Sequence, residues 1–126
     1  MPARIRYIVT DVSAAVAFYM KHLGFRVERQ FAPTFVILSH GDLRLLVTAS
    51  TGPSGAAQPM PDGRRPEPGG WNRIQLVVRD IAAVVESLRK SGVRFRNEIV
   101  TGRGGKQILV EDSSGNPIEL FEPTRT

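Results

Sequence analysis

The chain carries RIRYIVTD at residues 4–11 and a similar stretch, WNRIQLVVRD, at residues 71–80. In both, apolar side chains alternate with other residues, which is the period-two pattern of a β-strand with one buried face. Both stretches end in an aspartate, Asp11 or Asp80, a residue type that favours the N-cap of a following helix. The sequence therefore predicts the same strand-to-helix unit twice, which indicates an internal repeat.

The residues after each aspartate extend this repeat. Apolar residues recur at helical spacing over about residues 12–22 and 81–90, and each helix is predicted to stop at a glycine, Gly24 or Gly92. Three further strands are expected in each half, at FRVERQF, TFVILS and LRLLVT in the first and at VRFRNEIV, KQILVED and PIELFE in the second. Each half thus reads as β-α-β-β-β, and the fold class is α+β.

The segment between the halves has a different composition. Residues 51–70 read TGPSGAAQPMPDGRRPEPGG, and so many prolines and glycines predict a long loop. We therefore expect a single domain over residues 1–126, with a first module at about 3–50, this loop at about 51–70 and a second module at about 71–123. Since one helix covers only one face of a sheet, the other face of each sheet needs a partner or a ligand.

The composition limits the class of protein. A chain of 126 residues has room for one compact domain. It has no cysteine, which excludes disulfides, thiolate metal sites and a cysteine nucleophile and agrees with a reducing compartment. No apolar run approaches the length of a membrane helix. We therefore expect a cytoplasmic protein with no membrane association.

The net charge of +5 comes from 17 basic and 12 acidic residues, and 14 of the basic ones are arginine. The basic residues are scattered along the chain, with Arg64-Arg65 the only two adjacent arginines, whereas nucleic-acid surfaces cluster basic residues among aromatics. No nucleic-acid partner is expected. Arginine can donate two parallel hydrogen bonds to a carboxylate or phosphate, so some of these residues are candidates for contact with a small anion. The alternative is that the many arginines reflect codon usage and lie on the solvated surface without binding a ligand.

Two fragments carry a resemblance to a known family. The residues DV at 11–12, AFY at 17–19 and LGF at 23–25, together with EDSSGNPIEL at 111–120, resemble the vicinal oxygen chelate (VOC) superfamily of glyoxalases, bleomycin-resistance proteins and extradiol dioxygenases. The resemblance implies two tandem modules that form open, curved mixed sheets around a central cavity. It leaves the chemistry open, because one scaffold hosts several activities.

Metal-dependent members of that superfamily bind a divalent cation with side chains from the first and fourth strands of each half. The first-strand positions correspond here to Arg4 and Arg73, and arginine has no lone pair to donate to a metal. The last strand of the second half keeps a carboxylate at Glu119, whereas LRLLV at 43–47 offers neither carboxylate nor imidazole. We therefore expect no dedicated metal site and no cofactor, with Glu119 as a residual metal ligand remaining an alternative.

Strand parity predicts which side chains face the cavity instead. The apolar face of each first strand should pack against its helix, which turns the alternate residues towards the cavity. The predicted ligand-binding residues are Arg4, Arg6, Arg44, Trp71, Arg73, Gln75, Glu119 and Phe121. Glu119 would neutralise one or two of the arginines, and the others would favour an anionic ligand. The alternative is an internal salt-bridge layer that seals the halves together without a ligand.

Two classes of function follow. The first is a metal-independent small-molecule-binding protein of the glyoxalase/bleomycin-resistance type, with an arginine-rich pocket for an anionic or oxygen-rich ligand. The second is an enzyme of the lyase, isomerase or dioxygenase-like kind, in which Glu119 is the catalytic general base and Arg4 or Arg73 stabilises an oxyanion. A homodimer is expected in both cases, because the resemblance implies pairing and an open sheet edge favours it.

Overall fold

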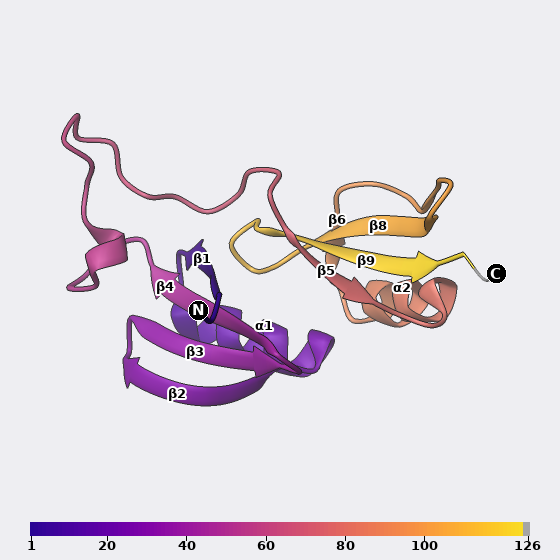
Figure 1. Cartoon of the computed structure of the whole chain (residues 1–126), viewed down its shortest axis with the longest axis horizontal. Helices are drawn as coiled ribbons and strands as arrows, with labels where there is room; N and C mark the ends of the chain where they lie inside the picture. The colour runs from indigo at the N-terminus through magenta and orange to yellow at the C-terminus, as the bar shows by residue number, and fades with distance from the viewer. Residues whose placement is uncertain (125–126) are drawn as a thin grey trace. The chain divides into compact units, whose positions relative to one another are not determined.

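The computed structural model describes residues 1–124. The chain divides into two compact units, Met1–Gly69 and a second that begins at Gly70, and each is described by itself. Each unit contains one α-helix packed on an open mixed sheet (Figure 1). This confirms an α+β fold built of two modules. Among the described residues, no helix has both the length and the apolar character needed to cross a membrane.

The first unit has the predicted β-α-β-β-β order. Its elements are β1 (Ile5–Val9), α1 (Val12–Leu23), β2 (Arg26–Ala32), β3 (Phe35–His40) and β4 (Leu43–Ala49). The sheet order is β1-β4-β3-β2, with β1 parallel to β4 and the other pairs antiparallel. The long helical connection between β1 and the hairpins is what allows the parallel pair.

The helix α1 begins and ends as the sequence predicts. The Asp11 side chain accepts a hydrogen bond from the backbone N–H of Ala14 at 3.0 Å, and Gly24 ends the helix with a φ of 72°, which suits glycine. On the inner face, the buried Tyr19 ring contacts the rings of Tyr7 and Phe25. The core of this unit therefore lies between α1 and one face of the sheet. The opposite face, which α1 does not cover, is termed the open face.

The loop that follows β4 contains one short helical turn, the 3-10 helix η1 (Gly55–Ala57). Ala57 is buried, and the Gln58 side-chain amide donates hydrogen bonds to the carbonyls of Gly52 and Ser54. Further along, the Met60 N–H donates to the Arg64 carbonyl at 2.8 Å and closes an exposed turn. The rest of residues 51–70 forms neither helix nor strand, as predicted.

The second unit repeats the arrangement of the first. Its elements are β5 (Ile74–Val77), α2 (Ile81–Lys90), β6 (Arg94–Phe95), β7 (Val100–Thr101), β8 (Gly105–Glu111) and β9 (Pro117–Pro123). The sheet order is β5-β9-β8-β6, with β7 also paired to β8 and with β5 parallel to β9. Asp80 caps α2 through the N–H of Ala83, and Gly92 follows the helix with a φ of 80°.

One predicted strand is corrected by the structure. The stretch VRFRNEIV was expected to be continuous, but it forms the two short strands β6 and β7. The side chain of Asn97 explains the break, because its Oδ1 accepts a hydrogen bond from the Leu109 N–H at 2.9 Å. A side-chain oxygen thus takes the place of a backbone acceptor, and regular pairing stops until Val100.

Candidate functional site

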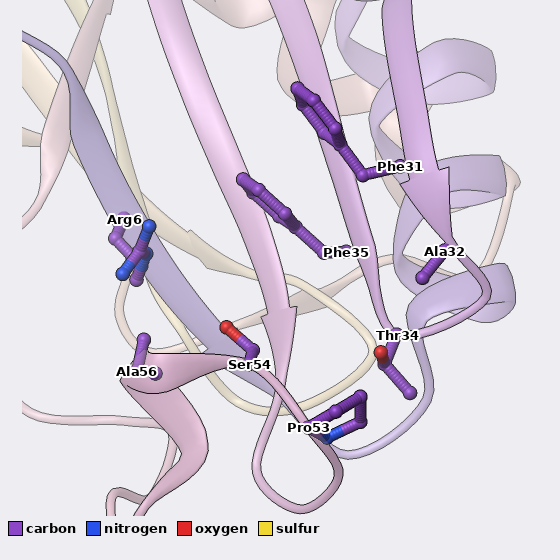
Figure 2. Close-up of a pocket in the computed structure, with 9 residues that line it drawn as sticks. Arg6, Phe31, Ala32, Thr34, Phe35, Pro53, Ser54 and Ala56 are labelled. Carbon is purple, nitrogen blue, oxygen red and sulfur yellow. The ribbon is translucent and has the colours of Figure 1, made fainter.

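The strand β1 turns Arg6 towards the open face of the first sheet. Tyr7 and Val9 are buried on the α1 side, and alternation directs Arg6 the other way. There Arg6 lines a pocket of about 550 Å³ (Figure 2). The opposite walls come from the hairpin between β2 and β3 and from residues 53–56 of the loop after β4.

Two phenyl rings dominate the hairpin side of this pocket. Phe31 and Phe35 stack with ring centroids 5.0 Å apart and planes inclined by 11°. Figure 2 shows both rings extending to the same side of the hairpin. Phe31 is 50% exposed. The pocket therefore offers a flat apolar surface that neither strand buries.

Guanidinium groups lie over both rings. The Arg6 Cζ is 5.6 Å from the centroid of the Phe35 ring, and the Arg29 Cζ is 4.4 Å from that of Phe31. Both distances fall within the range of cation–π attraction, which is about 6 Å. The pocket thus combines aromatic faces with positive charge.

Arg4 and Arg44, the other arginines predicted in this module, do not line the pocket. Arg44 does reach the open face, but it forms an ion pair with Glu28 and donates to the Gly41 carbonyl at 2.8 Å. Its charge is therefore already matched by a carboxylate. Arg4 precedes β1 and is exposed.

In the second module, the structure brings together three residues that the sequence predicted. The parallel register of β5 and β9 places Gln75 opposite Glu119. Glu119 is only 7% exposed, and its Oε1 accepts hydrogen bonds from Nε and Nη2 of Arg73 at 3.0 and 2.9 Å. Its Oε2 accepts a hydrogen bond from the Gln75 amide at 2.6 Å. The buried carboxylate is thus held by a cation and an amide from neighbouring positions.

Trp71 lies between two arginines: its carbonyl accepts a hydrogen bond from Arg73 Nη1 at 3.3 Å, and its ring contacts Arg96, a residue that the sequence analysis did not identify. Arg96 pairs with Glu111 at 2.9 Å and donates to the carbonyls of Gly70 and Gly115 at 2.7 and 2.9 Å. Its guanidinium lies over the exposed Trp71 ring, 4.9 Å from the centroid. This cluster fixes the start of the second module. The remaining predicted residue, Phe121, is half-buried on β9.

Comparison with known families agrees with this architecture. The family model described as Glyoxalase/Bleomycin resistance protein/Dioxygenase superfamily matches residues 2–120. The chain belongs to this superfamily. No curated protein matches the sequence, so the comparison assigns no activity to this chain.

Solved structures of the superfamily fold cover nearly the whole chain. A superfamily member from Sphaerobacter thermophilus DSM 20745 is 26% identical with a TM-score of 0.73, and 95% of each chain is covered. An antibiotic binding protein, TnmS3, from Streptomyces sp. CB03234 is 21% identical with a TM-score of 0.70, covering 97% of this chain and 95% of that one. A lactoylglutathione lyase from Agrobacterium tumefaciens is 18% identical with a TM-score of 0.70, covering 95% and 92%. The last two show likeness of fold alone.

The residues present do not fit the divalent metal that metal-dependent members of the superfamily use. Within residues 1–124, no group of three or more histidine, cysteine, aspartate or glutamate side chains is placed to hold a cation. Both oxygens of Glu119 already accept hydrogen bonds, and Arg73 supplies a fixed positive charge beside them. His22 lies at the end of α1 beside Phe18, where burial, followed by the charge of Lys21, lowers its pKa.

Proposed function

We propose that this protein is a small-molecule-binding member of the superfamily that works without a divalent metal and takes an anionic or oxygen-rich ligand. The observation that carries the proposal is Arg6, which lines the pocket of about 550 Å³ and pairs with no carboxylate in the described part of the chain. Small-molecule pockets in proteins have volumes of about 300–1,000 Å³. An arginine in such a pocket is a ready partner for a carboxylate or phosphate.

The other predicted residues have supporting parts in this proposal. Arg73, Gln75 and Glu119 supply a fixed polar cluster on the open face of the second sheet. Trp71 and Phe121 supply flat apolar surface, Arg4 adds positive charge, and Arg44 stays paired with Glu28. The proposal includes a homodimer in the cytoplasm, acting as one domain over residues 1–126.

Ligand binding is tested with small anions and a charge-matched control. Thermal shift and isothermal titration calorimetry would be run with benzoate, citrate and inorganic phosphate, each with EDTA and again with added Mn²⁺ or Zn²⁺. We expect at least one anion to stabilise the protein equally under both conditions. The Arg6→Gln variant should lose that stabilisation, while Lys21→Gln, which removes the same charge from the exposed side of α1, should retain it.

Two results would overturn this proposal. One is the absence of any anion effect, together with identical behaviour of Arg6→Gln and the wild type. The other is binding that occurs only with added metal, which would mean that the donor groups rearrange to form a cation site.

An enzymatic function remains the second candidate because of one atom. Glu119 Oε1 accepts two hydrogen bonds but Oε2 accepts one, so Oε2 keeps a position that could receive a substrate proton. The Glu119→Gln variant separates the two candidates. A binding protein should keep its ligand affinity within a few-fold, whereas an enzyme would keep binding and lose turnover.

A further inference from the structure

The arginines of the open faces fall into two groups by their partners. Arg44 pairs with Glu28, Arg73 with Glu119 and Arg96 with Glu111. Each of these charges is matched within its own module. Arg6 and Arg29 differ, because within residues 1–124 neither side chain pairs with a carboxylate and each lies over a phenyl ring. Of these two, Arg6 is the one that lines the pocket. An unmatched guanidinium beside a pocket attracts an anion more strongly than one already held by a carboxylate.

The position of Phe31 gives a second, independent indication. All residues of β2 from Arg26 to Phe31 are exposed, so folding alone does not require a phenyl ring there. Two β-bulges in the pairing of β2 with β3, at Glu28 and Phe31, interrupt the alternation and bring Phe31 to the same face as Phe35. Bulges of this kind change the direction of side chains, and here the Phe31 and Phe35 rings stack while Phe31 stays half exposed.

The two features lie at the same pocket. Arg6 and the phenyl pair line it together, and the apolar side chains of Pro53 and Ala56 close another side (Figure 2). Aromatic rings prefer to stack at centroid distances of about 4.5–7 Å. Since Arg29 lies over Phe31 and Arg6 over Phe35, a planar ligand would extend the existing stack by displacing one of these guanidinium groups from its ring. Thr34 on the hairpin wall and Ser54 on the loop wall carry hydroxyl groups that can bind ligand oxygens.

We infer that this pocket selects flat aromatic anions, with the Phe31–Phe35 pair recognising the ring system and Arg6 the acidic group. The inference rests on the proposed binding function and specifies its ligand class. It also assigns a binding role to Phe31 and Phe35, in addition to the arginines. A ligand with only one of the two features loses either the stacking or the charge pairing.

Three probes of similar size separate these features. They are 2-naphthoate, which is flat and anionic, decahydro-2-naphthoate, which is anionic but not aromatic, and 2-naphthylmethanol, which is aromatic but neutral. Calorimetric titration of the full chain should give a dissociation constant for 2-naphthoate at least about tenfold below those of the other two. The preference over the saturated acid measures stacking, and the preference over the alcohol measures charge.

Three variants assign each preference to a residue. Phe31→Leu keeps an apolar side chain at an exposed position, so it should fold normally and lose most of the preference for the aromatic acid. Arg6→Gln should instead lose the preference for the acid over the alcohol. Lys21→Gln is the charge-matched control and should bind all three probes like the wild type. Circular dichroism and a thermal melt would verify that each variant is folded.

The outcomes also distinguish this inference from the broader function. If both acids bind equally and Phe31→Leu changes neither affinity, aromatic selection is wrong while anion binding stands. If Arg6→Gln binds the acids as tightly as the wild type, Arg6 is not the anion contact and the inference is again wrong. If none of the acids, benzoate, citrate or phosphate binds at all, the inference and the proposed function fail together.

Discussion

At the scale of single residues, Glu119 depends on the side chains around it. A carboxylate that is 7% exposed has lost most of its hydration, and the nearby Arg73 guanidinium and Gln75 amide replace that hydration with three hydrogen bonds. Arg73 is itself partly open to solvent, with 28% of its side chain exposed. The pair is therefore a fixed part of the second module, and removing either residue alone should lower the free energy of unfolding.

This dependence predicts a specific pattern of stability. Arg73→Met leaves the buried carboxylate without its cation and should lower the free energy of unfolding by about 2–3 kcal/mol. The double variant Arg73→Met/Glu119→Leu removes both charges and should be less destabilised than the sum of the two single variants, by about 1–3 kcal/mol. Urea denaturation measures all three.

Lys90→Met provides the control, because it breaks the exposed Glu86–Lys90 pair on α2. Its effect should stay within about 0.5 kcal/mol. Additive effects of the Arg73 and Glu119 substitutions would show that the two side chains do not depend on each other.

The sequence could predict some of these residues but not others. Alternation along β1, β5 and β9 was sufficient to place Arg6, Gln75 and Glu119, because these strands are regular. It failed for Phe31, since two bulges in β2 break the period of two, and no local residue pattern marks a bulge of this kind. The ion pair of Arg44 with Glu28 was missed because it joins β4 to β2, two strands that are separated by β3 in the sheet.

At the scale of elements, the pairing of β8 with β9 depends on a close backbone approach. Gly105, opposite Pro123, has a φ of 152°, and a Cβ there would collide with the carbonyl oxygen of Glu122. Gly105→Ala should therefore lower the free energy of unfolding by at least about 2 kcal/mol. Chemical denaturation checks this value.

The neighbouring glycine offers a matched control. A Cβ at Gly104 would meet only the Phe121 ring at 3.7 Å, an ordinary contact. Gly104→Ala should therefore change stability by no more than about 0.5 kcal/mol. Equal effects at the two positions would mean that the close approach of β8 and β9 is not what requires Gly105.

The order and type of the helices and strands could be predicted, because the helix-capping residues and the spacing of the apolar residues indicate the same elements along most of the chain. Asp11 and Asp80 cap their helices through their side chains, and glycine follows both helices. The break between β6 and β7 could not be predicted, because it depends on a hydrogen bond from Leu109 to Asn97, two residues far apart in sequence. Such a contact has no signature in the local pattern of either segment.

At the scale of the whole molecule, the proposed homodimer leads to a prediction about one exposed sheet edge. Val77 is 66% exposed on β5, which is an edge strand of its sheet among the described residues. An edge strand presents backbone groups with which another chain can pair. Sedimentation equilibrium should give twice the 13.9 kDa mass of one chain. Val77→Lys should weaken the dimer by at least about tenfold, whereas Ser87→Lys on α2 should not. A monomer at every concentration would contradict the homodimer.

The loop between the modules also determines where a protease can act. Trypsin cleaves after arginine but not before proline, so of the two basic residues in the loop only Arg64 is followed by a cleavable bond. The Arg64 side chain is 83% exposed on the turn that the Met60 N–H closes. One nick there would divide the covalent chain without cutting any helix or strand, so that any remaining association of the two fragments would be noncovalent.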